Sequence, residues 1–267
     1  MAINYETRTQ AYIDVDSSFG TASVNLVDGN LSFNHTDWEF GGGPTAFSLS
    51  HVYAGANYNN NQFYTGLNTG NGYGWKTNFD QYLIGDTTGA IYIDASGRKH
   101  TFKNSNGTIY DDGGLGLKLT KVNDTGPCKI VTDLVGNTLH FSATGYLCRI
   151  DTIFGNSIFV RHNANGSIKE IENGDNVATF TYNSNNLLSS VSYTGASETL
   201  NFEYSNGYLT TIKKTIGSSV SIQAQFAYTD NRLSRIYGND YTDTRVTYSN
   251  SKVSQISTCS KSQGTAL

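Results

Sequence analysis

One short phrase recurs through residues 138–256 and constrains the fold more than any other feature of the sequence. Each copy places an apolar residue two positions before a ring-bearing one, then a polar turn, then two aliphatic residues three positions apart. The ring position falls at Phe141, His162, Tyr182, Tyr204, Tyr228 and Tyr248. Successive copies are 20 to 24 residues apart, and a fixed period of this size is typical of a repeat architecture.

Each copy has the length of two strands and two turns. Residues two apart in a strand share one face, so the apolar and aromatic residues of a copy are expected to line up into an aromatic ladder. The predicted repeat core is Phe180, Tyr182, Phe202, Tyr204, Phe226, Tyr228 and Tyr248. The two aliphatic residues are separated by an odd step. Either they face opposite ways or a turn lies between them.

Composition supports an all-β chain. Its 267 residues include 18 Tyr and 13 Phe, which favour pleated, half-buried surfaces, and 28 Gly, which supply the positive φ angles of tight hairpins. No window shows helical periodicity. Charged residues make up only 15% and the net charge is −4, which argues against binding to a nucleic-acid backbone.

The residues before the repeats also read as strands. Phe47, Leu49, His51 and Tyr53 alternate with small or polar residues, which predicts a half-buried strand. Residues 54–72 are rich in Asn, Gly and Tyr and are expected to form a long exposed loop. The predicted organisation is an opening β segment at 1–125, a repeat sheet at 126–258 and a flexible tail at 259–267.

Neither end of the chain carries a targeting or capping element. The amino-terminal residues lack the basic and apolar regions of a secretory signal, and no apolar run could form a transmembrane helix. Either the protein leaves the cell by a route that needs no such signal, or it is a piece of a longer polypeptide. Repeat arrays normally need caps, and because none follows the last repeat we expect a fragment.

Several phrases resemble the bacterial Rhs, or YD-repeat, family. They are Gly145-Tyr-Leu-Cys-Arg-Ile-Asp151, Tyr228-Thr-Asp-Asn-Arg-Leu-Ser-Arg-Ile236 and, upstream, Asp28-Gly-Asn-Leu31 and Gly72-Tyr-Gly-Trp75. The resemblance covers about residues 24–256. Few copies keep the Asp after Tyr, and His162 replaces Tyr in one of them.

This resemblance implies one long, twisted and curved antiparallel sheet that is part of a hollow shell. In full-length relatives such a shell encloses a C-terminal toxic or processed domain, or belongs to a surface adhesion protein. It also implies an extracellular or cell-surface location. The family's downstream self-cleaving motif is missing, so no autoproteolysis is carried over.

Motifs for catalysis are absent from the sequence. The five histidines, His35, His51, His100, His140 and His162, lack ligand spacing, and structural roles are expected for them. There is no GxSxG elbow or P-loop. The candidate carboxylate pairs are Asp14/Asp16, Asp111/Asp112 and Glu170/Glu172. Glu170 and Glu172 are expected to share a strand face, which a glycosidase pair could use, but a solvated strand face is the favoured interpretation.

Two other candidate sites have weak signals. Asp240 and Asp243 beside Asn239 could hold calcium, but their spacing fits no EF-hand loop. A disulfide between Cys128 and Cys148 is weighed against three unpaired thiols, which is the simpler interpretation.

Aromatic residues beside the long loop provide the best alternative function. Sugar rings stack on exposed aromatic platforms, and the candidate residues are Tyr53, Tyr58, Tyr64, Tyr73 and Trp75. Packing of these rings within the sheet is the favoured interpretation, because aromatic residues usually bury their large surfaces in cores.

Three functions are therefore considered. The first is a non-catalytic structural segment of a toxin-enclosing or wall-associated shell, whose partners are further repeats, a C-terminal domain, or a second copy through edge strands. The second is a glycan-binding or adhesion module. The third is a carbohydrate-active enzyme on a β-solenoid. No cofactor, metal, catalytic residue, nucleic-acid partner or membrane insertion is expected.

Overall fold

The computed structural model describes residues 12–40, 47–55, 58–59, 62–63, 69–85, 89–105, 108–111, 116–121, 129–132, 135–238 and 242–260. These residues form antiparallel strands and contain no α-helix, so the all-β prediction is confirmed. No helix in this described part of the chain has the length and hydropathy needed to cross a membrane.

A 14-stranded sheet is the largest element, and its spatial order follows the chain order. Its strands are β12 (Lys118–Lys121), β13 (Lys129–Thr132), β14 (Thr138–Phe141), β15 (Leu147–Asp151), β16 (Ser157–His162), β17 (Ile168–Asn173), β18 (Asn176–Tyr182), β19 (Leu188–Tyr193), β20 (Glu198–Ser205), β21 (Tyr208–Ile216), β22 (Ser219–Thr229), β23 (Arg232–Tyr237), β24 (Thr242–Ser249) and β25 (Lys252–Ser260). Each repeat supplies one hairpin, beginning with β14 and β15. The sheet itself begins earlier, at β12.

Two smaller sheets precede it. The five-stranded sheet contains, in spatial order, β1 (Tyr12–Ser17), β2 (Gly20–Asn25), β3 (Leu31–Phe40), β4 (Phe47–Ala54) and β7 (Trp75–Thr77). The four-stranded sheet contains β11 (Thr108–Asp111), β10 (Lys99–Ser105), β9 (Gly89–Ile93) and β8 (Tyr82–Gly85). A short hairpin joins β5 (Tyr58–Asn59) to β6 (Gln62–Phe63).

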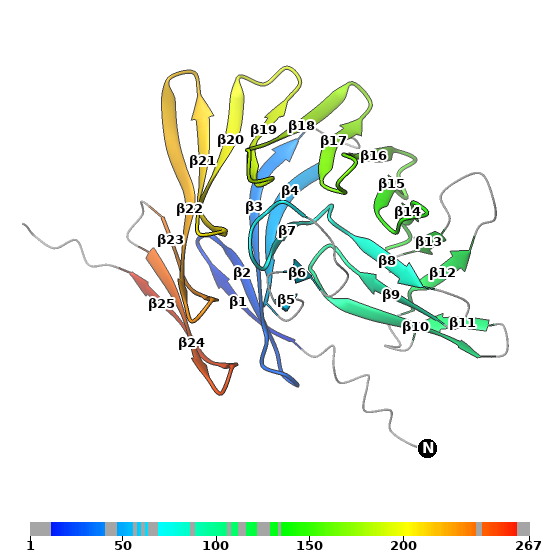
Figure 1. Cartoon of the computed structure of the whole chain (residues 1–267), viewed down its shortest axis with the longest axis horizontal. Helices are drawn as coiled ribbons and strands as arrows, with labels where there is room; N and C mark the ends of the chain where they lie inside the picture. The colour runs from blue at the N-terminus through cyan, green and yellow to red at the C-terminus, as the bar shows by residue number, and fades with distance from the viewer. Residues whose placement is uncertain are drawn as a thin grey trace, which may run out of the picture.

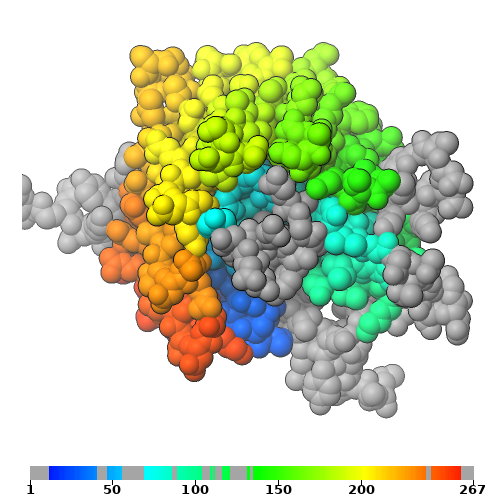
Figure 2. Space-filling view, viewed as in Figure 1, coloured from blue at the N-terminus to red at the C-terminus, as the bar shows by residue number. Residues whose placement is uncertain are grey.

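The long sheet curves around the amino-terminal strands. In Figure 1 the hairpins from β14 to β25 form an arc, and β1–β4 and β7 lie on its concave side. Figure 2 shows the same arc as a continuous band from green to red. Buried residues of the five-stranded sheet and of the repeats form one hydrophobic core.

A β-bulge at the same position in all six repeats explains the odd step between the two aliphatic residues. The register shifts just before Phe141, His162, Tyr182, Tyr204, Tyr228 and Tyr248. In the third repeat, Tyr182 faces Leu188 while Thr181 faces Ser190, so Ser189 is the extra residue. The bulge brings Leu188 and Val191 to the same face, and both are fully buried. Both alternatives in the sequence interpretation, opposite faces or an intervening turn, are therefore wrong.

Hydroxyl groups on the extra residues stabilise several bulges. Ser189 Oγ donates to the Thr181 carbonyl at 2.9 Å, and Thr210 Oγ1 donates to the Glu203 carbonyl at 3.0 Å. Ser234 Oγ makes the equivalent bond to Ala227 at 3.2 Å. These side chains satisfy backbone carbonyls at the point where the regular ladder is disrupted.

Burial of β4 differs from the prediction. Besides Leu49 and His51, the opposite-face residues Val52 and Ala54 are also buried. The turn between β9 and β10 covers them, because a Cβ on Gly97 would contact Ala54 and Val52. The strand is therefore buried on both faces rather than half-buried.

The described end of the 54–72 loop is also not exposed, because Thr69, Gly70 and Asn71 are buried.

Candidate functional site

A glycine-rich segment, residues 69–74, runs between the five-stranded sheet and the repeat hairpins; we call it the glycine strap. Its backbone bonds directly to the repeats. The Leu188 amide donates to the Gly70 carbonyl at 2.7 Å, and the Tyr73 amide donates to the Gly207 carbonyl at 2.9 Å. The strap thus joins the N-terminal segment to the third and fourth repeats.

Three strap glycines have a positive φ and surroundings that only glycine allows, and two of them, Gly70 and Gly72, lie against the repeats. Gly70 has φ +66°, and an added Cβ would lie 2.5 Å from a ring carbon of Tyr182. Gly72 has φ +81°, and its Cβ would lie 2.7 Å from the Gly207 carbonyl oxygen. Any side chain here would be strained and would push the strap away from the tyrosine rings.

The strap belongs to a longer row of contacts along the repeats. In four repeats, the first aliphatic residue donates its backbone amide to the N-terminal segment. Leu147 donates to the Gln81 carbonyl at 3.2 Å, Leu188 to Gly70 at 2.7 Å, Leu233 to the Tyr53 hydroxyl at 3.3 Å and Val253 to the Gly29 carbonyl at 2.8 Å. These amides adjoin the bulges. The repeated irregularity therefore provides the donors that bind the N-terminal segment.

Tyrosine hydroxyls make a second row that connects successive repeats. Tyr182 donates to the Ile168 carbonyl at 2.7 Å, Tyr228 to Leu209 at 2.6 Å, and Tyr248 to Leu233 at 2.7 Å. Each acceptor is the first aliphatic residue of the preceding repeat. Tyr204 departs from the pattern, because its buried hydroxyl has no hydrogen-bond partner among the described residues.

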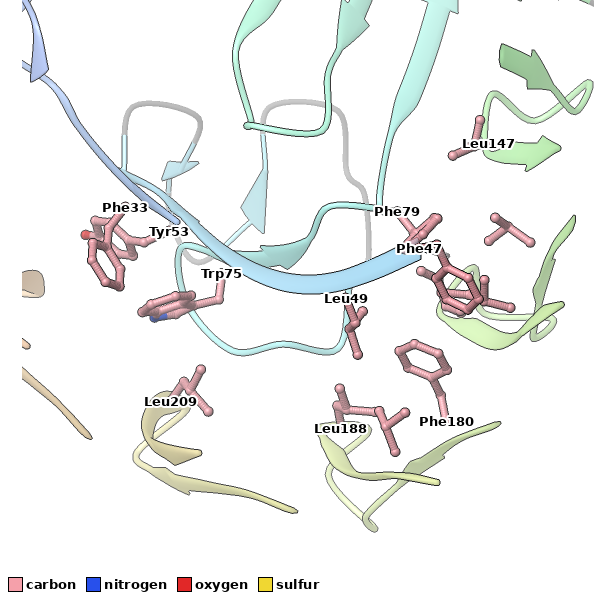
Figure 3. Close-up of a cluster of buried hydrophobic side chains, with 14 of the residues drawn as sticks. Phe33, Phe47, Leu49, Tyr53, Trp75, Phe79, Leu147, Phe180, Leu188 and Leu209 are labelled. Carbon is pink, nitrogen blue, oxygen red and sulfur yellow. The ribbon is translucent and has the colours of Figure 1, made fainter. Parts of the chain in front are cut away.

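Apolar contacts fill the space behind these hydrogen bonds. The Trp75 ring lies 4.5 Å from the Phe226 ring, and its Nε1 donates to the Tyr228 hydroxyl at 2.7 Å. Phe33 packs edge-on against both Trp75 and Phe226. Figure 3 shows Trp75 and Leu49 pointing toward Leu209 and Leu188 on the repeat hairpins.

A buried polar network lies beside the strap. His51 Nδ1 is 2.6 Å from Asp37 Oδ2, and His51 Nε2 is 2.9 Å from Asn71 Oδ1. Asp80 Oδ2 accepts from the side-chain amide of Asn71 at 3.1 Å. It also accepts from the backbone amide and the hydroxyl of Thr77, at 2.7 and 2.9 Å. His51 is completely buried. Its ring lies 4.7 Å from the Phe202 ring of the repeats, tilted by 38°, so the network contacts both halves of the core.

The proposed glycan platform is contradicted at two of its five residues. Tyr53 and Trp75 are buried, at 4% and 0% exposure, because both rings pack between the five-stranded sheet and the repeats. Neither ring can stack against a sugar. Tyr73 is half-buried and packs edge-on against Tyr208 at 5.0 Å. The Tyr58 side chain and Tyr64 lie outside the described residues.

The predicted repeat-core residues lie together. Phe180, Phe202 and Phe226 are buried, and Tyr182, Tyr204, Tyr228 and Tyr248 pack partly buried against the same core. His162 occupies the tyrosine position, 5.1 Å from the Tyr146 ring. Burial lowers the His162 pKa to about 4, so this ring is neutral near pH 7.

The carboxylate pairs are engaged in structural contacts. Glu170 and Glu172 both pair with Arg161 on an outward strand face. Asp14 and Asp16 accept from Ser23 and Thr21 on the neighbouring strand. Asp111 accepts from the Leu117 amide at 3.3 Å. Asp112 lies outside the described residues.

Asp243 pairs with Arg235 and Arg245. Its Oδ2 lies 2.9 Å from Arg235 Nε and 3.1 Å from Arg245 Nε, and these bonds help to hold the pKa of Asp243 below its usual value despite burial. Asn239 and Asp240 lie outside the described residues, as does Cys128. Within the described part of the chain, no three His, Cys, Asp or Glu side chains are grouped as metal ligands.

A known family model matches part of the chain. Residues 21–102 match the family model described as Domain of unknown function (DUF6531). This match ends before the first repeat and covers less than half of the chain. No curated protein sequence matches the chain.

Among solved structures, the chain is similar to the structure titled TcdB2-TccC3 without hypervariable C-terminal region. Identity is 11% and the TM-score is 0.31. The similarity covers 88% of this chain but only 13% of that one.

Proposed function

We propose that the chain is a non-catalytic structural segment of a bacterial Rhs or YD-repeat protein. In this proposal, its N-terminal sheets fix the first turns of a curved repeat wall, and the wall encloses or presents a toxin or effector domain. The observation that carries the proposal is the row of bulge amides in four repeats that bind the N-terminal segment. The resemblance of the repeat phrases to that family supports it.

Such a role requires the wall to grow at β25, which pairs with β24 alone among the described strands. Three of the four ladder tyrosines, Tyr182, Tyr228 and Tyr248, donate their hydroxyl to the first aliphatic residue of the preceding repeat. By that rule, the Val253 carbonyl is the acceptor for a tyrosine of a following hairpin. Unpaired edge strands bind further strands through main-chain hydrogen bonds, and side chains then select the partner.

The chain's own last hairpin provides a probe for this edge. A peptide with the sequence of residues 242–260 should bind the full chain saturably and protect the β25 amides from hydrogen exchange. The peptide carrying Tyr248→Phe should bind about 3- to 10-fold more weakly, which corresponds to one hydrogen bond. Binding that leaves the β25 amides unprotected, or equal affinities for the two peptides, would refute the addition of a further hairpin at this edge.

A further inference from the structure

The hydrogen-bond partners of His51 determine its charge. Nδ1 lies 2.6 Å from a carboxylate oxygen of Asp37, and Nε2 lies 2.9 Å from the side-chain oxygen of Asn71. The Asn71 amide orientation is fixed, because its nitrogen lies 2.7 Å from the Thr69 carbonyl and 3.1 Å from Asp80 Oδ2. Both partners of His51 therefore accept, so both ring nitrogens must donate. Only the imidazolium form has two N–H groups.

The surroundings of the ring suit a buried cation. From β3, Asp37 supplies the paired charge, and His35 Nε2 lies 3.8 Å from Asp37 Oδ1. From the turn after β7, Asp80 adds a second carboxylate behind Asn71. From the repeats, the Phe202 ring lies 4.7 Å from the His51 ring at a tilt of 38°, and an aromatic ring at this distance attracts a cation.

Other groups near the network do not compete for the same bonds. The Lys76 ammonium donates to the Thr77 and Ala95 carbonyls at 2.9 and 3.0 Å. Tyr204, on the repeat side, carries a hydroxyl whose pKa is raised well above its ordinary value by burial, so it is neutral.

We propose that protonated His51 holds the glycine strap in place through Asn71, and that loss of this proton weakens the contact between the N-terminal segment and the repeats. Neutral His51 would keep one N–H and place a lone pair against either Asp37 or Asn71 Oδ1. The Asn71 bond is the one that fixes the strap. From there the effect reaches the repeats through the Gly70 carbonyl, which accepts from Leu188.

The direction of the pH effect follows from the same contacts. Burial lowers the pKa of His51, but the Asp37 charge and the hydrogen bonds to Asp37 and Asn71 outweigh it and raise the pKa above 6.5. The stabilisation is therefore fully present below pH 6.5 and is lost as pH rises through the folded-state pKa. Lys76 has the opposite sign: burial lowers its pKa to about 8, so its contribution to stability increases as pH rises from there toward 10.5.

Nitrogen NMR of the full chain, labelled with ¹⁵N-histidine, tests the proposal. At pH 7, both ring nitrogens of His51 should be protonated, and His51→Gln assigns the signal. His162, half-buried and with no carboxylate among the causes of its lowered pKa, should give a neutral ring in the same sample. A neutral His51 ring at pH 7, including one whose proton resides on Asp37, would overturn the proposal.

Hydrogen exchange tests the consequence for the strap. As pH rises through the folded-state pKa of His51, the protection factor of the Leu188 amide should fall. The fall should be about tenfold for each unit by which the His51 pKa in the folded protein exceeds that in the unfolded protein. In His51→Gln this added pH dependence should disappear, while that of Lys76 remains. If that variant does not fold, the pH dependence of Leu188 protection in the wild-type chain still tests the proposal. Leu188 protection that is independent of the His51 titration would refute the link to the strap.

Discussion

Individual tyrosine hydroxyls in this chain differ in what they contribute, although their positions in the repeat are equivalent. Tyr228 both accepts from Trp75 and donates to the Leu209 carbonyl. The Tyr204 hydroxyl is buried and has no hydrogen-bond partner among the described residues. The sequence predicted that both rings lie in the core, since they share a strand face with Phe226 and Phe202. It could not distinguish their hydroxyls, because the partners come from other repeats and from β7.

A pair of single-atom deletions tests this difference. Tyr228→Phe should destabilise the chain by about 2 kcal/mol, because it leaves the Trp75 N–H and the Leu209 carbonyl without a partner. Tyr204→Phe, the matched control, should be neutral within about 0.5 kcal/mol or stabilising, because it removes a buried hydroxyl that has no partner. Urea unfolding of both variants measures the free energies. Equal losses would contradict the assigned hydrogen bonds.

Two elements, the repeat bulge and the buried glycine strap, were not predicted from the sequence, for different reasons. The odd step between Leu188 and Val191 signalled an irregularity, but a bulge was not among the alternatives considered. The strap has the Gly- and Asn-rich composition of an exposed loop, and composition does not show what a segment lies against. The clue was the alternation of Gly70, Gly72 and Gly74, which all have positive φ.

Alanine substitutions distinguish the cost of a positive φ angle from the cost of steric overlap with the repeats. Gly72→Ala and Gly195→Ala both place a side chain at positive φ, +81° and +79°, which costs about 1–2 kcal/mol each. Only Gly72 has a neighbour within reach, whereas nothing lies within 4 Å of a Cβ on Gly195. Gly72→Ala should therefore lose at least about 1 kcal/mol more, from overpacking. Thermal or urea unfolding gives the comparison, and equal losses would mean that the strap does not press against the repeats.

At the scale of the whole molecule, the N-terminal strands and the repeat hairpins share one hydrophobic core, although the sequence interpretation divided them into an opening β segment and a repeat sheet. Strand periodicity predicted the hairpins, and the resemblance predicted a single curved sheet, because both signals are local and repeated. Burial of both faces of β4 could not be predicted, since its cover comes from the distant turn around Gly97. The His51 network was also missed, because Asp37, Asn71 and Asp80 lie far from His51 in sequence and have no motif spacing.

The central claim is that the N-terminal sheets and the repeats form one cooperative structure. Native-state hydrogen exchange of the full chain at low denaturant concentrations tests it most directly, because it resolves the opening free energy of each region. Amides of β3, β4 and β7 and the strap amide of Tyr73 should open with the same free energy as those of Leu188 and Leu233. If the N-terminal strands instead open with a clearly smaller free energy while the repeats stay protected, the two parts are independent and the account is wrong.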